Sequence, residues 1–591
     1  MDQTSSAVLP LPVETIDPIT PSRAEDYAPI SGRLWFRVAI IFLLLLSAVP
    51  IVNYGIHIRP QIYSNTDGLH WGDAYNAIQY GQGSIHYGLF HLYEPMYQAQ
   101  RAGIDPLPDR TRTAMDYPPL RLMVVGAWAR WAQRTNTANR LDYAGSGSNV
   151  IIPMLRLNTA SELISSILVF LLIRMWCIRA NLASGRQMPW WRGIPAGYIG
   201  ALLMWFNPGL LWNSYAFPQW DTWIIPFFLS AVLMACVDWW FAAGLLIGMG
   251  AFLKGQMFIV APLFIFWPLF QLKWDAAVRW LCGLAMISAA IALPFMEPSK
   301  AALIQFLFAV AALAMSIPFV IRLRLDYRLL LVCGAIAGAL AWPWNSDASI
   351  GFRIVPLGLA GLVWLLRYVR PRIVPHLFAL VVAVLVFMLM PLHHASDFWF
   401  QVGFKHGTEK FPIVATAGTN NLPAILIRYF QIGGTGEGQA ETPVDVWLLG
   451  QMQIRTLMIG LYGACLVLCS FSAARHMRKS DPRFLLAMAT PWICSFALLT
   501  QLNNRYIVWA AGMSALLPAV GVGMTLLGIL ISFLAWEGVA QLMYNKYDAG
   551  SEISRYLNPL QTNLGWLLAL AAAVYLYVML VPRPRLQTGK A

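Results

Sequence analysis

The segment LWFRVAIIFLLLLSAVPIVN, residues 34–53, is apolar over almost its whole length. A helix needs about 20 such residues to cross a hydrocarbon core about 30 Å thick. Comparable apolar runs recur from Leu34 to Leu580 in this 591-residue chain, which is 58% hydrophobic and only 12% charged, whereas soluble domains carry roughly 25% charged residues. The sequence therefore predicts an all-α, polytopic membrane protein.

Basic residues beside these runs predict the orientation, because Lys and Arg concentrate in cytoplasmic loops. Arg33 and Arg37 lie at the start of the first span, so we expect residues 1–33 to form a cytoplasmic tail. This tail is polar and has no basic-then-apolar signal pattern, which favours disorder. Later basic clusters that would return to the cytoplasm are at residues 179–192, 273–279, 322–328, 367–372, 475–483 and 583–585.

The remaining residues, 34–591, are expected to form one transmembrane domain with about 14–16 spans. Two large loops, residues 55–153 and 392–454, would lie on the outer side. Within the first, residues 119–134 carry three arginines and are expected to form a helix along the membrane surface. Spans with clear limits are residues 34–53, 154–178 and 562–581, and residues 506–541 are long enough for two.

Charge and cysteine usage exclude two other classes of protein. The formal net charge of +13 lies in short clusters beside apolar runs, so it reflects topology and does not indicate nucleic-acid binding. The seven cysteines lie in apolar segments without CxxC spacing. We therefore expect no disulfide framework, no metal site and no cofactor.

Polar residues at membrane depth are costly and tend to mark function. Under the predicted topology these residues gather at the outer ends of the helices. The topology rests on Lys and Arg counts in other loops, so the clustering is an independent indication of a site. The set comprises Asp67, Asp73, Asp116, Gln219, Asp221, Lys254, Gln256, His393, His394, Lys405, His406, Lys410, Asn503 and Arg505. A carboxylate can accept the proton of an attacking hydroxyl, and cations can stabilise charge on a departing phosphate.

Several of these residues stand in short motifs that follow one another in a recognisable order. They are Trp71-Gly72-Asp73-Ala74-Tyr75, Asp116-Tyr117-Pro118-Pro119-Leu120, Asn207-Pro208-Gly209-Leu210, Pro218-Gln219-Trp220-Asp221, Lys254-Gly255-Gln256-Met257 and Asn503-Asn504-Arg505-Tyr506. In this order they resemble the GT-C glycosyltransferases, most closely the dolichyl-phosphate-glucose-dependent glucosyltransferases of N-glycan assembly and their bacterial relatives.

The resemblance covers most of residues 34–275 and returns near residues 392–425 and 500–506. Three departures from the family pattern stand out. One residue is inserted between Lys254 and Gln256, and Asn503-Asn504-Arg505 lacks the histidine of the family's C-terminal turn, which affects how phosphate would be bound. Residues 296–391 align with no part of the family pattern, so the acceptor stays unidentified.

The resemblance implies a GT-C fold and transfer of a hexose or other sugar from a polyprenyl-phosphate donor to a hydroxyl on the outer (periplasmic or luminal) face. Asp73 would be the general base of a single inverting displacement; retention through a covalent intermediate stays open. The donor phosphate would be held by Lys254, Arg505, Lys405 and His406. The substrate cavity would be lined by Asp67, Asp116, Tyr117, Gln219, Asp221, Gln256 and Asn503.

Simpler interpretations exist for several of these residues. Asp73 could cap an interfacial helix, with Asp67 as the rival acid, and Asp116 could merely shape a turn before two prolines. Lys254 could snorkel to the interface. The histidines show no helical i, i+4 pair and are more typical of loop residues than of metal ligands.

The expected partners are a polyprenyl-phosphate-sugar donor, a lipid-linked or cell-envelope glycan acceptor and membrane lipids, without nucleic acid. The expected location is a bacterial inner membrane with the N-terminus in the cytoplasm. A transporter or flippase of lipid-linked saccharides is the main alternative, although coupling charges would then be expected near the midplane. A polymerase or ligase acting on lipid-linked glycans is the second.

Overall fold

A computed structural model describes residues 30–65, 80–81, 83–102, 117–135, 147–183, 193–297, 398–405, 420–430, 443, 445–448, 452–547 and 552–582. In these residues the chain is almost entirely helical. The only strands in the described part are β1 (Trp447–Leu448) and β2 (Met452–Gln453), which pair antiparallel. The expectation of an all-α protein is confirmed.

Contacts divide the chain into two units, Met1–Tyr54 and Gly55–Ala591. The described part of the first unit belongs to helix α1 (Ile30–Asn65), whose large side chains, such as Trp35 and Phe42, are exposed. Only 6% of the most apolar stretch of this helix is buried. An apolar helix that is exposed all round suits lipid and not water.

Helix α1 is longer than the sequence predicted, because residues 55–65, expected in the outer loop, continue the helix. Its 36 residues give a length of about 54 Å, well beyond the hydrocarbon core. The extension is tied down within the second unit by Arg59, which donates to Glu162 Oε2 at 2.9 Å and to the Trp205 carbonyl at 2.8 Å. This buried ion pair stabilises a helical turn that sequence polarity placed in a loop.

The second unit contains the rest of the helices. The first group is α3 (Tyr93–Ala102), α4 (Pro119–Thr135), α5 (Gly147–Ala183), α6 (Ile194–Trp205), α7 (Pro208–Leu211), η2 (Trp212–Ala216), η3 (Asp221–Trp223), α8 (Ile224–Cys236), α9 (Trp240–Leu253), α10 (Met257–Val260), α11 (Leu263–Phe270), α12 (Trp274–Ala292) and η4 (Leu293–Phe295). The second is α17 (Phe398–Phe400), η6 (Gln401–Lys405), α19 (Leu422–Tyr429), α20 (Ile454–Arg478), α21 (Arg483–Leu498), η8 (Asn504–Tyr506), α22 (Ile507–Ser514), η9 (Leu517–Ala519), α23 (Val522–Tyr547) and α24 (Glu552–Leu580).

Six helical segments in the described residues are long and apolar enough to cross a membrane, and five shorter apolar helices accompany them. The chain is therefore a multi-pass membrane protein. The expected spans 154–178 and 562–581 lie within α5 and α24, and the expected surface helix 119–134 coincides with α4. Residues 296–391 lie almost wholly outside the described residues, so the number of 14–16 spans stays a prediction.

Residues 506–541 are broken as expected, but the first half is not a helix of span length. It consists of α22 and η9, separated by a turn at residues 515–516, and α23 starts at Val522. Pro518 and Gly521 explain the interruption, since proline lacks the N–H that a continuous helix needs and glycine is a poor helix former.

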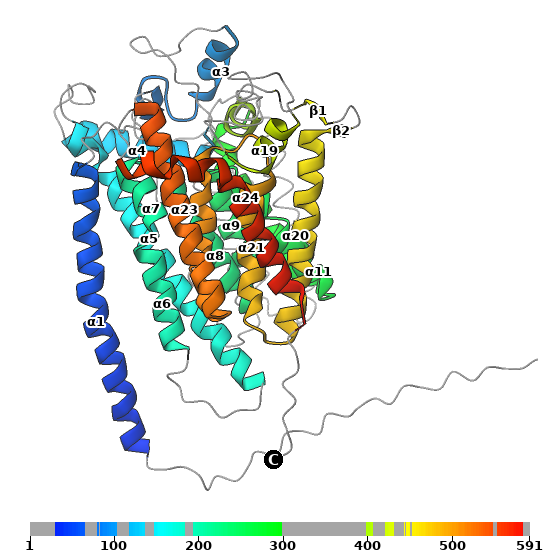
Figure 1. Cartoon of the computed structure of the whole chain (residues 1–591). Coiled ribbons are helices and arrows are strands. Elements are labelled where there is room, and N and C mark those ends of the chain that lie inside the picture. Colours follow the sequence, from blue (N-terminus) through cyan, green and yellow to red (C-terminus); the bar gives the residue numbers. More distant parts are fainter. Residues whose placement is uncertain are drawn as a thin grey trace, which may run out of the picture. The chain divides into compact units, whose positions relative to one another are not determined.

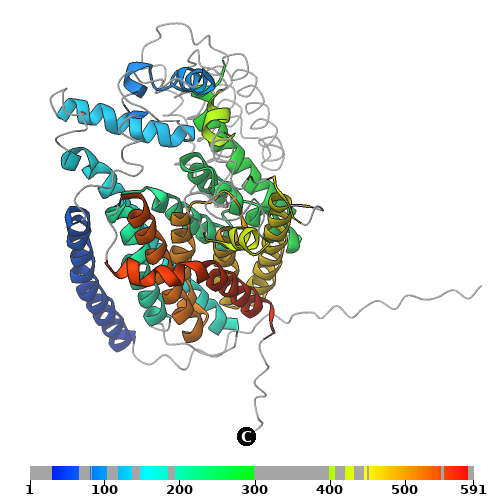
Figure 2. The same ribbon diagram turned by 45° about the horizontal axis from the view of Figure 1, so that its top comes forward.

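The long helices of the second unit run side by side, and Figures 1 and 2 show α4 lying across their direction. Close packing depends on glycine. In α9, Gly244 and Gly248 face α12; a Cβ on Gly244 would meet the Trp280 carbonyl oxygen at 2.1 Å. Gly283 of α12 makes the reciprocal approach to Phe241. Small residues four apart are what lets membrane helices approach closely.

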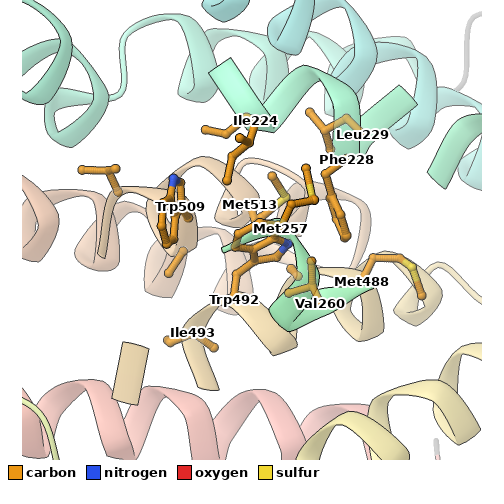
Figure 3. Packing of buried hydrophobic residues seen from close by; sticks show 14 of the residues in the cluster. Ile224, Phe228, Leu229, Met257, Val260, Met488, Trp492, Ile493, Trp509 and Met513 are labelled. Atoms are coloured by element: carbon orange, nitrogen blue, oxygen red, sulfur yellow. The ribbon is translucent and has the colours of Figure 1, made fainter. Parts of the chain in front are cut away.

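Large apolar side chains fill the space between α8, α10, α21 and α22. Figure 3 shows Phe228, Met257 and Trp492 interlocked in this core. Trp492 also meets Trp509 edge to face, with 5.8 Å between the ring centroids. Trp509 connects this apolar core with the polar residues described below.

Arginines cap the ends of several helices where α21 begins. Arg179 donates to the carbonyl of Cys236, the last residue of α8, at 2.7 Å, and Arg478 donates to the carbonyl of Phe270, the last residue of α11, at 2.7 Å. The last carbonyls of a helix have no partner within it and carry partial negative charge. The basic residues of this end thus have a structural role.

The end of α24 is capped in the same way. Arg483 donates to the Val581 carbonyl and also forms an ion pair with Asp481 at 2.7 Å. The buried His476 lies 2.9 Å from the Met579 carbonyl, and Arg475 donates to the Leu580 carbonyl at 3.2 Å. We call this the Arg483 end of the second unit.

Candidate functional site

The turn from Phe217 to Asp221 lies at the other end of these helices, here called the Arg505 end. It follows η2, a π-helical turn, and leads into η3; π-turns are frequent at functional sites. The buried Asn158 of α5 fixes the turn by donating to the carbonyls of Ser214 and Gln219 at 3.0 and 2.9 Å. Gln219 and Asp221 are consequently held in place and fully buried.

Lys254 meets this turn from α9. The helix ends at Leu253, and Lys254 adopts an extended conformation that turns its side chain away from the helix axis. Its ammonium forms an ion pair with Asp221 Oδ1, and the side chain is only 6% exposed. It also lies 4.6 Å from the ring centroid of Tyr506 and 5.3 Å from that of Trp509. Lys254 does not snorkel to an interface; it is a buried, paired cation.

Arg505 reaches the same carboxylate from η8. Its Nη1 donates to Gln219 Oε1 at 2.7 Å, and its Nε lies 3.4 Å from Asp221 Oδ2. Asn503 caps the turn by accepting from the Arg505 backbone N–H at 3.1 Å. The Asn503 side chain therefore holds the backbone of Arg505 in place.

These three charged groups do not cancel. Lys254 and Arg505 supply two positive charges and Asp221 one negative charge, which leaves the set at +1. The Arg505 side chain is the most exposed of the three at 16%. Charge in a poorly solvated setting acts more strongly than in water, so this set, which we call the Asp221 cluster, is suited to attract an anion.

Tyr117 joins the cluster through aromatic contacts. Its ring meets Trp220 edge to face at 5.3 Å, and the Arg121 guanidinium lies 3.6 Å from the Tyr117 centroid and 3.5 Å from that of Trp220. The Tyr93 hydroxyl donates to the Tyr117 carbonyl at 2.7 Å, and burial raises the pKa of Tyr93 well above its usual value. Tyr117 is thus held against the Gln219–Asp221 turn.

Two other predicted residues lie nearby but outside the cluster. Lys405 ends η6 and is exposed, with its ammonium 5.7 Å from the Phe400 centroid. The preceding residues pack beside the site: a Cβ on Gly403 would meet the Tyr117 carbonyl oxygen at 3.0 Å. Gln256 is half-buried, and among the described residues its side chain donates no hydrogen bond to the cluster.

Seven of the polar residues singled out in the sequence lie outside the described residues. They are Asp67, Asp73, Asp116, His393, His394, His406 and Lys410. Their proposed roles stay predictions.

Unpaired polar atoms concentrate around the cluster. Each of the following residues buries at least one side-chain nitrogen or oxygen that has no hydrogen-bond partner in the described part of the chain: Asn213, Ser214, Gln219, Thr222, Asn504 and Glu537. Leaving a buried polar group unpaired costs about 1–3 kcal/mol. Such a concentration indicates a place where ligand or water completes the hydrogen bonds.

Several of these residues had no place in the sequence interpretation. Arg121 was taken as a sign of a surface helix, whereas it is buried between two rings. Arg59 and Glu162 are 103 positions apart, and nothing in the sequence pairs them. Glu537 did carry a usable signal, since it is a lone acid in an apolar run.

No three His, Cys, Asp or Glu side chains come together as a metal site in the residues that the structure describes. Metal independence stays a prediction.

The chain matches no protein-family model and no curated protein sequence.

Proposed function

We propose that this protein is a GT-C glycosyltransferase that moves a sugar from a polyprenyl-phosphate donor to a hydroxyl acceptor. One observation carries the proposal: Arg505 and Gln219, 286 positions apart, meet at 2.7 Å beside the Lys254–Asp221 pair. Three motifs of the sequence resemblance thus supply one cationic cluster, and Tyr117 brings a fourth. Motifs that share a site are a stronger argument than motifs that share only an order.

The charge of the cluster suits the donor. A glycosyl polyprenyl phosphate is a phosphodiester with one negative charge, which the two cations Lys254 and Arg505 would bind. In the reaction the bond between the anomeric carbon and the phosphate oxygen breaks, and the electron pair leaves with the phosphate. Arg505 and Lys254 would stabilise this growing charge.

The acceptor hydroxyl would attack the anomeric carbon as its proton passes to Asp73, which acts as general base. General-base assistance contributes about 10² to 10⁴ in rate. One base and one displacement give inversion at the anomeric carbon. The second carboxylate at the site, Asp221, is engaged by two cations and would position them, leaving Asp73 for proton transfer.

The proposal includes an orientation, with the Arg505 end facing the periplasm of a bacterial inner membrane and the N-terminus in the cytoplasm. The basic residues that cap helices at the Arg483 end support it, because arginines and lysines favour the cytoplasmic side. Cysteines introduced at residues 100 and 430 should react with impermeant reagents from outside, whereas cysteines at residues 325 and 478 should not. The reverse pattern would overturn the orientation.

Turnover by purified protein tests the function directly. The protein in nanodiscs is incubated with glucosyl, mannosyl or galactosyl polyprenyl phosphate and an extract of cell-envelope glycans. We expect release of free polyprenyl phosphate, detected by mass spectrometry. Lipids and glycans from cells with and without the gene would identify the sugar and the acceptor. Absence of polyprenyl phosphate release from every donor, with glycan profiles unchanged by deletion, would contradict the proposal.

A transporter or flippase of lipid-linked saccharides is the second candidate, and one observation favours it. Glu162 and Glu537 are buried carboxylates inside helical segments of span length, and such residues can couple ion movement to transport. A transporter would move glycolipid across a vesicle membrane without cleaving its phosphate bond. The turnover experiment therefore separates the two functions.

A further inference from the structure

Glu537 is a buried carboxylate that the proposed reaction does not use. It lies in the span-length part of α23 and is only 5% exposed. Neither of its carboxylate oxygens has a hydrogen-bond partner among the described residues. Burying such a group without a partner is costly, and an ionisable residue at membrane depth is by default a candidate for a functional site.

The next residue of α23 connects Glu537 to the Asp221 cluster. The Gly538 carbonyl accepts a hydrogen bond from Asn504 Nδ2 at 3.2 Å, and Asn504 directly precedes Arg505. The Asn504 side chain packs on the bare Cα of Gly538, where an added Cβ would lie 3.4 Å from Nδ2. Asn504 Oδ1 is itself buried without a partner in the described residues.

Asn213 belongs to a second turn that packs on α23. It lies in the π-turn η2, which packs on α23 through the rings of Trp212 and Trp536, 6.0 Å apart. Its carbonyl accepts from the Gln219 backbone N–H at 3.0 Å. Both polar atoms of its side-chain amide are buried and have no partner in the described part of the chain.

The chemistry of these atoms indicates the kind of ligand. Glu537 offers two oxygens, Asn213 an oxygen and an N–H₂ group, and Asn504 one oxygen. Four acceptors and one donor in a buried place suit the O–H groups of a polyhydroxylated molecule. A carboxylate repels phosphate, so this set is not a second anion site.

We propose that Glu537, Asn213 and Asn504 bind hydroxyl groups of the donor sugar, next to the phosphate held by the Asp221 cluster. This inference rests on the proposed function, because the sugar of that donor is bonded directly to the phosphate. The two sets of residues then bind two parts of the same donor molecule. The cations bind the phosphate that every donor shares, and the Glu537 set selects the sugar.

The test measures binding of two ligands to each protein variant in nanodiscs. The ligands are bare polyprenyl phosphate and its glucosyl, mannosyl and galactosyl derivatives. Wild type should bind at least one glycosylated lipid more tightly than the bare phosphate. Glu537→Gln, which keeps the shape but loses the charge, should weaken that glycosylated lipid by about 10- to 100-fold, the effect of a lost hydrogen bond to a charged group, and leave bare phosphate unchanged.

Asn213→Ser provides a second variant with the same expected direction, so that the inference does not depend on one substitution. The matched control is Thr525→Val, which removes a half-buried hydroxyl from the far end of α23 and should change neither affinity. Equal weakening of both ligands by Glu537→Gln, or no weakening of either, would overturn the sugar subsite. Failure of wild type to bind bare polyprenyl phosphate would instead overturn the proposed function.

Discussion

The cations near the two ends of α21 have different kinds of partner. At the Arg483 end, Arg483, Arg475 and Arg478 donate to backbone carbonyls of helix ends, so their positive charge is matched by fixed protein groups. At the Arg505 end, Lys254 and Arg505 share one carboxylate, and buried polar atoms of neighbouring residues lack partners in the described chain. Cations of the first kind complete the fold, whereas those of the second kind are suited to a ligand.

This difference gives a rule for reading charged residues in this protein. A cation whose donors end on helix carbonyls should affect stability when it is removed. A cation that shares a carboxylate within a net-positive cluster should affect ligand binding. Measurements of ligand binding and of unfolding on the same variants therefore distinguish the two kinds of cation.

The largest effect is expected for Asp73→Asn. Asparagine keeps the shape of aspartate without its basicity, so turnover should fall at least about 100-fold while the protein folds and donor binding stays near normal. Asp67→Asn is the matched control and should be far milder. Loss of donor binding together with activity would point to a structural role for Asp73, and near-normal turnover would remove it as the base.

Lys254→Met should come next. The substitution keeps the length and apolar stem but removes the ammonium, so the cluster falls from +1 to neutral and affinity for polyprenyl phosphate should drop about 10- to 100-fold. Lys273→Met removes an exposed lysine from the Arg483 end and should leave affinity unchanged. Equal binding by wild type and Lys254→Met would exclude Lys254 from the phosphate site.

Arg121→Met should have a smaller effect, because it removes a guanidinium that lies against the rings of Tyr117 and Trp220 and leaves Lys254, Arg505 and Asp221 in place. Loss of these contacts should lower kcat/KM about 3- to 10-fold. Arg130→Met is the control on the same helix, since Arg130 is exposed. A similar loss in both variants would show that α4 acts through its overall charge and not through this contact.

The smallest effect is expected for removal of divalent metal. The cluster provides its own positive charge for the leaving phosphate, so activity in chelator should equal that in buffer. Loss of all activity, restored by adding a divalent ion, would show that the protein cations are insufficient.

Much of the fold was predictable from hydrophobicity, because lipid-spanning helices need long apolar runs. The sequence located the second span within α5, the last within α24 and the helix α4, and it indicated that residues 506–541 do not form one helix. It missed the extension of α1 to Asn65, because that segment looks polar. The Arg59–Glu162 pair that holds it forms only in the folded chain.

The candidate site was predictable in its residue types and less so in its pairings. Sequence polarity selected Gln219, Asp221, Lys254 and Arg505, and the structure joins them. It gave no reason to expect that Asp221 would pair with both cations, because Lys254 lies 33 positions away and Arg505 farther still, and helix packing brings them together. The burial of Arg121 could not be predicted from the sequence for the same reason.

The most direct test of the comparison is one experiment on two arginines, Arg505→Gln and Arg483→Gln, each measured for unfolding and for binding of polyprenyl phosphate in nanodiscs. We expect Arg505→Gln to bind about 10- to 100-fold more weakly and to remain folded. Arg483→Gln should bind like wild type but lose about 2–3 kcal/mol of stability, because its bonds to Asp481 and Val581 are broken. Normal phosphate binding by Arg505→Gln, or weaker binding by Arg483→Gln than by Arg505→Gln, would contradict the assignment of the ligand site to the Arg505 end.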